Sequence, residues 1–75
     1  MVLFPAPDSL VQATVDEVLP RVGLAYLVDH QGGQWTITRQ TPGLGLEGLV
    51  PGQRVHLTLT HYENFTWVHH YDIAP

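Results

Sequence analysis

RVGLAYLVDHQGGQWTIT, residues 21–38, is the stretch that decides the fold of this chain. Both of its arms are rich in β-branched and aromatic residues, which favour extended strands. The glycines of Gln31-Gly32-Gly33 lie between the arms and can adopt the positive φ that a tight hairpin turn requires. The sequence therefore predicts one strand over residues 22–29, a turn, and a second strand over residues 34–39.

Three more strands are predicted on either side of this hairpin. Residues 11–16 alternate apolar and polar side chains, and residues 54–60 do so most regularly, with Val55, Leu57 and Leu59 on one face. Residues 65–73 form the fifth strand because they are rich in aromatic and β-branched residues. Pro42-Gly43 and Pro51-Gly52 each supply the central pair of a type II turn. The connection between them is too glycine-rich for a helix, and its Leu44, Leu46 and Leu49 are expected to tuck against the core.

The parity of the last two strands predicts their register. Paired residues of antiparallel strands share a face, so their numbers add to a constant. A sum near 126 keeps the apolar faces together and places Leu59 opposite Trp67. The other pairs of this register are Val55 with Tyr71, His56 with His70, and Thr58 with Val68. Trp67 is then a core residue, as Trp35 is, and His69 faces inward.

Five short strands separated by turns predict an all-β fold, a small five-stranded OB-type barrel that is closed or nearly closed. Closure is favoured because it removes exposed strand edges. An SH3-like barrel is the alternative. At 75 residues the chain makes one domain, here residues 10–75, after an extended lead-in over residues 1–9 that contains two prolines.

Composition narrows the function classes. The net charge is -4, lysine is absent, and Arg21, Arg39 and Arg54 carry all the side-chain positive charge, so the chain does not attract polyanions as a whole. The absence of cysteine excludes disulfides and thiolate zinc sites and fits a cytoplasmic location. No signal peptide is expected, and no apolar run approaches the ~18 residues that a membrane helix needs.

The order of these elements resembles a cold-shock domain. Val22-Gly23-Leu24-Ala25-Tyr26-Leu27 stands where that family has Lys-Gly-Phe-Gly-Phe-Ile, and Trp35-Thr36-Ile37-Thr38 stands where it has Val-Phe-Val-His. Leu49-Val50-Pro51-Gly52-Gln53-Arg54-Val55 is similar to its Leu-x-x-Gly-Gln-x-Val. TRAM domains have related patterns, so the likeness is to the superfold more than to one family.

The resemblance implies binding of single-stranded nucleic acid, RNA or DNA, across the second and third strands. The residues it implicates are Arg21, Gly23, Leu24, Tyr26, Thr36, Thr38 and Arg39. Tyr26 would stack a base, the two arginines would meet phosphates, and Gly23 would allow close approach of the backbone. Leu24, Thr36 and Thr38 replace stacking aromatics, and Asp16 and Glu17 replace a basic and an aromatic residue. Because each stacked base contributes about 1–3 kcal/mol, the binding is expected to be weak and tolerant of sequence.

Two questions stay open in the sequence. The resemblance places Ala25, Leu27, Trp35 and Ile37 inside, whereas a count of hydrophobic residues favours Leu24, Tyr26 and Val28 with Trp35. The solvent exposure of Tyr26 depends on this choice. The function is open as well: a protein-interaction or assembly module, for instance a homodimer, is the alternative to nucleic-acid binding.

No catalytic, metal or cofactor site is predicted. His56, His70 and His61 could meet on neighbouring strands, but no carboxylate or cysteine completes a zinc set. Gly43-x-Gly45-x-x-Gly48 matches a dinucleotide-binding fingerprint only formally, because no helix follows it. Ser9 is the sole serine and lies in the lead-in without a fixed base, while Asp16 and Glu17 point to opposite faces of their strand. The chain is therefore expected to be non-enzymatic.

Overall fold

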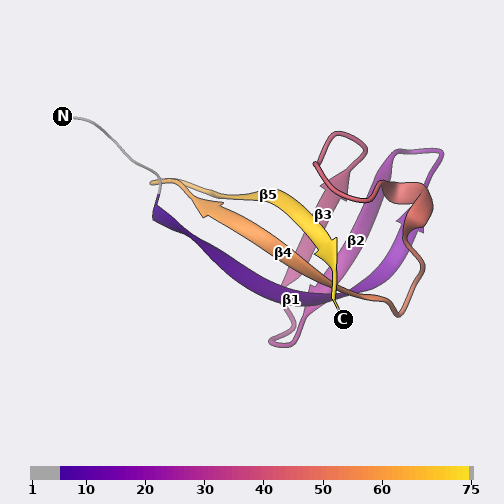
Figure 1. The fold of residues 1–75 in the computed structure, drawn as a ribbon, viewed down its shortest axis with the longest axis horizontal. Helices are drawn as coiled ribbons and strands as arrows, with labels where there is room; N and C mark the ends of the chain where they lie inside the picture. The colour runs from indigo at the N-terminus through magenta and orange to yellow at the C-terminus, as the bar shows by residue number, and fades with distance from the viewer. Residues whose placement is uncertain (1–5, 75) are drawn as a thin grey trace.

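The five predicted strands are present in the computed structural model, which describes residues 6–74 and, among these, side chains from Ser9 onward (Figure 1). The elements are β1 (Ala6–Leu19), β2 (Leu24–Asp29), β3 (Gln34–Thr38), a 3₁₀ turn η1 (Leu46–Gly48), β4 (Arg54–His61) and β5 (Thr66–Ile73). The all-β prediction is confirmed. β1 is longer than predicted, since residues 6–9 of the expected lead-in belong to it; residues 1–5 lie outside the described part of the chain.

All strands pair antiparallel in one curled sheet, in the order β3-β2-β1-β4-β5. β1 is the central strand: its second half pairs with β2 and its first half with β4. The result is a half-barrel, compatible with an OB-like barrel, from which a longer arm of β1, β4 and β5 extends (Figure 1). Within residues 6–74 no ladder joins β3 to β5, so the sheet is open where a closed barrel would have its last pair of strands.

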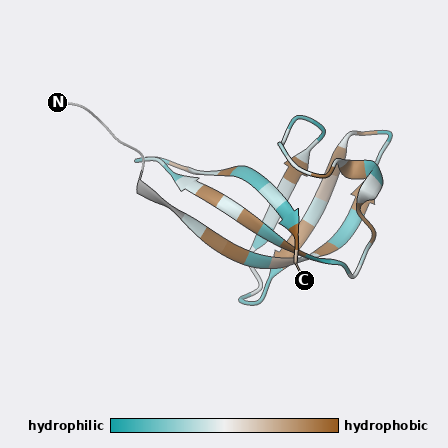
Figure 2. Ribbon diagram, viewed as in Figure 1, coloured by the Kyte–Doolittle hydropathy of each residue, from teal (hydrophilic) through white to brown (hydrophobic). Residues whose placement is uncertain are grey.

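The core lies on the concave side of this sheet, and apolar residues alternate with polar ones along the strands that enclose it (Figure 2). Tyr71, Leu27, Ile37, Leu57, Val15 and Val55 are its largest fully buried side chains from the strands. Leu46 of η1 and the following Leu49 are buried against them, as predicted. Leu44, which was expected to join them, is exposed.

The face of β2 is settled in favour of the arrangement that the family resemblance implied. Ala25 and Leu27 are fully buried, and Tyr26 points outward with 39 % of its surface exposed. Ala25 pairs with Ile37, and Leu27 pairs with Trp35, which is partly buried against the core. The hydrophobic count failed because one strand of alternating residues cannot bury both Tyr26 and Leu27, and Leu27 has the buried partners.

The predicted register of β4 and β5 is wrong. Val55 pairs with Ile73 and Leu57 with Tyr71, so the numbers of paired residues add to 128 in the C-terminal half of β5. In the N-terminal half, before His69, they add to 127, with Leu59 opposite Val68. His69 is the extra residue of a β-bulge and is exposed, not inward-facing. The bulge reverses the facing of the residues before it. Trp67 is therefore 58 % exposed rather than buried.

Candidate binding groove between β3 and β5

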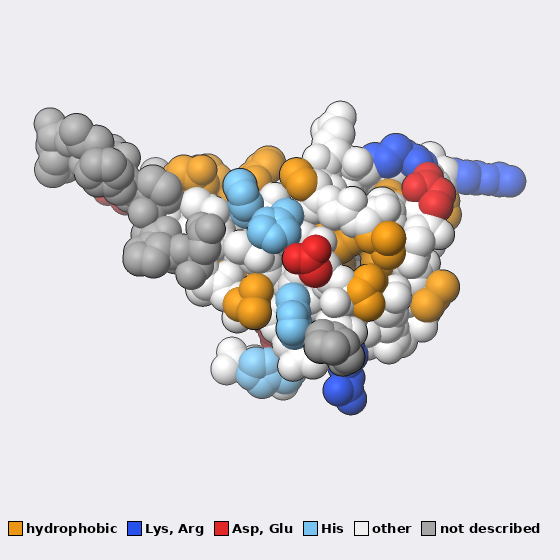
Figure 3. Space-filling view, in the orientation of Figure 1, with side chains coloured by type: hydrophobic (Ala, Val, Ile, Leu, Met, Phe, Trp, Pro, Cys, Tyr) orange, Lys and Arg blue, Asp and Glu red, His pale blue; other side chains and the backbone are white. Residues whose placement is uncertain are grey.

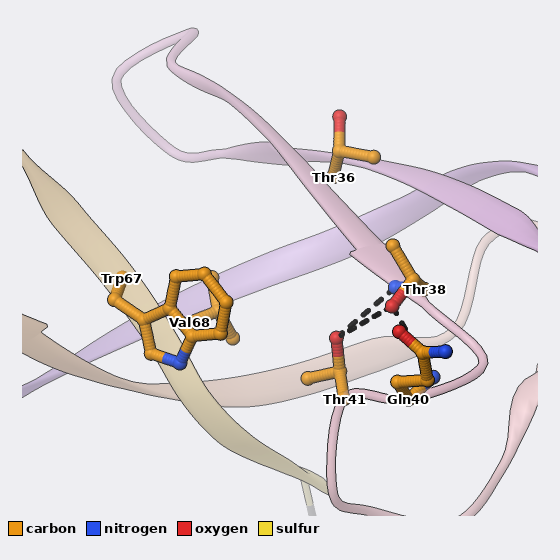
Figure 4. Close-up of a pocket in the computed structure, with 6 residues that line it drawn as sticks. All are labelled: Thr36, Thr38, Gln40, Thr41, Trp67 and Val68. Atoms are coloured by element: carbon orange, nitrogen blue, oxygen red, sulfur yellow. Dashed lines mark hydrogen bonds between the residues drawn. The ribbon is translucent and has the colours of Figure 1, made fainter.

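A groove of ≈ 180 Å³ occupies the open side of the half-barrel, between the two edge strands of the sheet (Figure 4). Trp67 and Val68 of β5 form one wall. The other wall is made by residues of β3 and of the loop after it: Thr36, Thr38, Gln40 and Thr41. None of these side chains carries a charge. The volume is below the ~300–1,000 Å³ typical of small-molecule sites, so a drug-sized ligand fits poorly.

The β3 wall presents unpaired backbone groups. The Asp29 N–H donates to Gly33 O over 2.9 Å, and the Arg39 N–H donates to Gly23 O over 3.2 Å. Hydrogen-bonded pairs alternate along an antiparallel ladder, so the odd-numbered residues of β3 bond to β2. The N–H and C=O of Thr36 therefore point away from β2 and into the groove.

The β5 wall presents unpaired groups in the same way. The Tyr62 N–H donates to Phe65 O over 2.8 Å, so these two residues form a hydrogen-bonded pair of the β4–β5 ladder. Because such pairs alternate with non-hydrogen-bonded pairs, Val68 belongs to a non-hydrogen-bonded pair, and its N–H and C=O face away from β4. Within residues 6–74, neither Thr36 nor Val68 has a backbone partner on its groove side. Two strand edges thus face each other across an uncharged groove.

One end of the groove is closed by hydrogen bonds. The Tyr71 N–H donates to Pro42 O over 3.1 Å, and the Gly45 N–H donates to the Tyr71 hydroxyl over 2.9 Å. Gly43 lies flat on the Tyr71 ring, where a Cβ atom at Gly43 would be 2.6 Å from Cε1. On the opposite wall the Thr38 N–H donates to the Thr41 hydroxyl over 3.0 Å. The loop after β3 therefore ties β5 at this end, and the edges remain free toward the arm.

The predicted nucleic-acid residues of β2 and β3 adjoin this groove. Tyr26 pairs with Thr36 across the ladder, and Leu24, which is half-buried, pairs with Thr38. A second hollow, lined by Asp16, Tyr26, Leu27, Gln34 and Thr36, shares Thr36 with the groove. The outward side of β2 and β3 thus continues to Trp67. Sequence reasoning missed Trp67 as a surface residue, because only the bulge at His69 exposes it.

The two predicted phosphate-binding arginines differ in their surroundings. Arg21 is exposed in the β1–β2 turn. Arg39 donates to Glu47 Oε1 over 2.5 Å and also to the Pro20 carbonyl oxygen. The backbone N–H of Glu47 and the Arg39 guanidinium together hold the pKa of Glu47 below its ordinary value. Arg39 is therefore committed to partners of its own chain.

Gly23 has a structural role in the β1–β2 turn. Its φ is +85°, in the left-handed region, and its carbonyl accepts the Arg39 hydrogen bond. Its N–H donates to Leu19 O over 2.8 Å. The positive φ and these two hydrogen bonds explain why a glycine occupies this position of the turn.

Four of the five histidines, His56, His61, His69 and His70, lie on β4 and β5, and His30 lies in the β2–β3 turn; Figure 3 shows several histidine side chains at the surface. His70 contacts Asp72 at 3.5 Å, and His56 faces Asp72 across the ladder instead of His70 as expected. No group of three metal-ligating residues exists among the side chains described. At the arm, Ser9 Oγ lies 2.6 Å from His61 Nε2, and Thr66 Oγ1 lies 3.1 Å from His61 Nδ1. β1 thus fixes Ser9, contrary to its expected place in a lead-in.

The arm also carries exposed apolar side chains. Tyr62 and Phe65 stack on each other at the hairpin turn, with ring centroids 4.8 Å apart, and both are exposed together with Leu10. In residues 6–74, no helix has the length and apolar character needed to cross a membrane. No protein-family model, curated protein or solved structure matches the chain. A function is therefore inferred from the arrangement of its residues.

Proposed function

We propose that this chain is a non-enzymatic protein-interaction module that binds its partner at the groove between β3 and β5. One observation carries the proposal: an uncharged groove, beside a tryptophan that is 58 % exposed, lies between two strand edges that have no ladder partner within residues 6–74. Large exposed apolar residues grouped together mark protein-interaction sites, and tryptophan is enriched at their energetic centres. Tyr62, Phe65 and Leu10 are further exposed apolar residues, on the arm.

Charge favours a protein partner over a nucleic acid. Contacts between cations and phosphates supply most of the affinity of sequence-independent nucleic-acid binding. Beside Tyr26 the chain instead has Asp16 and Glu17, and Arg39 is held by Glu47. Figure 3 shows basic side chains only at the margins of the face that it presents.

Weak binding of single-stranded nucleic acid remains the second candidate, for one specific reason. Tyr26 and Trp67 are both exposed, and Thr36 lines the hollow beside each of them, so two aromatic rings border one continuous surface. In OB-folds this side of the second and third strands binds oligonucleotides, and the strand order here is compatible with such a barrel. Stacking on two rings with few arginines nearby would give low affinity.

Two titrations of the purified chain, followed by tryptophan fluorescence, separate these candidates. The first uses peptides of about seven residues, a typical strand length, selected from a random library on the immobilised chain. The second uses a thymine oligonucleotide of about 15 nucleotides at low salt. Peptides that bind the wild type and fail to bind Trp67→Ala support the proposal. Selection of no peptide, together with salt-sensitive oligonucleotide binding that Tyr26→Ala abolishes, would overturn it in favour of the second candidate.

A further inference from the structure

We propose that the partner is an extended peptide of neutral to basic character that lies as a sixth strand along the open side of the half-barrel, between β3 and β5, with only a few of its side chains in the ≈ 180 Å³ groove. This inference rests on the proposed function and specifies how the partner is held. A peptide of this kind binds by strand addition: main-chain hydrogen bonds supply affinity, and alternate side chains supply specificity.

The backbone of the groove is arranged for such a strand. β3, β1 and β5 run in the same direction because each neighbour in the order β3-β2-β1-β4-β5 is antiparallel. A strand inserted between β3 and β5 can therefore run antiparallel to both, which is the more stable pairing. Thr36 offers its N–H and C=O from one side and Val68 from the other. The inserted strand would satisfy both edges, which have no ladder partner in the described part of the chain.

The side chains of the walls define what the strand should carry. Successive residues of a strand point to opposite faces, so alternate side chains of the peptide meet Val68 on the core side and Trp67 on the outer side. Val68 is packed against the core, which favours a β-branched or leucine side chain beside it. Thr36 and Thr38 on the facing wall suit small hydroxyl or apolar residues.

Charge complementarity selects a basic over an acidic peptide. The groove itself is neutral, and the chain carries a net charge of -4. Beyond Thr36, the hollow of Tyr26 is lined by Asp16, and Glu17 pairs with Tyr26 across the β1–β2 ladder. A lysine or arginine on the outer side of the peptide is attracted by these carboxylates and by the faces of the tyrosine and tryptophan rings.

The test uses synthetic peptides of about seven residues that alternate threonine with valine or leucine and end in arginine, with a matched set ending in glutamate. Affinity is measured by tryptophan fluorescence and, in Trp67 variants, by calorimetry. We expect the arginine peptides to bind about tenfold more tightly than the glutamate peptides at low salt, and the difference to shrink as salt is added. Equal affinity of the two sets would overturn the charge preference.

Strand pairing is tested with substitutions that remove one edge donor. Thr36→Pro and Val68→Pro each delete an N–H that points into the groove and leave the ladders to β2 and β4 intact, which edge strands tolerate. Thr36→Ala and Val68→Ala are the matched controls that keep the N–H. Each proline variant is expected to bind the arginine peptide about tenfold less tightly than its alanine control.

Because the proline variants could misfold, the same hydrogen bonds are also tested by modifying the peptide and keeping the protein wild type. Peptides carrying N-methyl groups at alternate residues lose the donors on one side and should bind wild-type protein at least tenfold less tightly than unmethylated peptides. Binding that neither proline nor N-methylation weakens would overturn the added strand and leave the proposed function standing, since Trp67→Ala would still abolish it. Failure of every peptide to bind would overturn both.

Discussion

The indole Nε1–H of Trp35 donates a 2.9 Å hydrogen bond to Oδ2 of Asp29, across the turn that joins β2 and β3. The other carboxylate oxygen of Asp29 accepts the backbone N–H groups of Gln31 and Gly33, at 2.9 and 2.8 Å. The Trp35 hydrogen bond is the main cause, and the Gly33 N–H the next, of a pKa of Asp29 below its ordinary value of 3.8. One ionised side chain therefore organises the turn of the hairpin that decides the fold.

Replacing Asp29 by asparagine should lower the thermal unfolding temperature at neutral pH. An amide has one acceptor oxygen where the carboxylate has two, so the three donors cannot all be satisfied. Because the folded-state pKa is depressed, the stabilisation by Asp29 is fully present above its ordinary pKa and is lost as the pH falls through the folded-state pKa.

The difference between wild type and Asp29→Asn should therefore narrow as the pH is lowered from about 5 to about 2. Circular dichroism melts of both proteins across this range measure the difference. A gap that stays constant down to the lowest pH would show that the charge of Asp29 contributes nothing to the turn.

Trp67→Ala should leave the fold nearly as stable as the wild type, within about 1 kcal/mol in the free energy of unfolding, because most of this side chain is in solvent. Tyr71→Ala, the matched change at a fully buried ring of the same strand, should cost about 3–5 kcal/mol. Urea denaturation followed by circular dichroism gives both values. A Trp67→Ala loss as large as that of Tyr71→Ala would place the indole in the core and refute the bulged register.

Gly43→Ala should destabilise the closed end of the groove by about 1–3 kcal/mol. The new methyl group would lie 2.6 Å from a carbon of the buried Tyr71 ring, and the ring cannot move without disturbing the core. Pro42→Ala is the control, since it keeps the carbonyl oxygen that accepts the Tyr71 N–H. Comparable urea midpoints for wild type and Gly43→Ala would show that the loop is free to leave the ring.

Glu47→Ala should strengthen whatever oligonucleotide binding the chain has at low salt by a few-fold, because it releases Arg39 and removes one negative charge. The double variant Arg39→Ala/Glu47→Ala should return the affinity to that of the wild type or below. Fluorescence anisotropy of a labelled thymine oligonucleotide measures both. Equal gains in the single and double variants would mean that Arg39 does not meet phosphate.

The strands were predictable because alternation is a local property of the sequence. Val55, Leu57 and Leu59 are buried as their alternation indicates, and Tyr71 is buried opposite Leu57. The bulge at His69 was not predictable, because one inserted residue has no sequence signature of its own. It nevertheless reverses the facing of Trp67. An uninterrupted count along β5 therefore assigned the indole to the wrong side.

The candidate site was only half predictable. The resemblance placed Tyr26, Thr36 and Thr38 together on the outer side of β2 and β3, and the structure does so. The other wall of the groove comes from β5, some 30 residues further along the chain, and depends on the bulge and on the Tyr71–Pro42 hydrogen bond. Such a juxtaposition arises from three-dimensional closure, which alternation and turn signals do not encode.

The hairpins β2–β3 and β4–β5 share no ladder in the described chain, and both are hydrogen-bonded to β1. β1 changes register at Asp16, where an extra residue opposite β2 bends the strand and increases its twist. Both hairpins are thus attached to a single bent strand, and the hydrogen bond from the Tyr71 N–H to the Pro42 carbonyl joins them to each other at one end. Deleting Asp16 should remove this bulge, straighten β1 and change the width of the groove between the two hairpins.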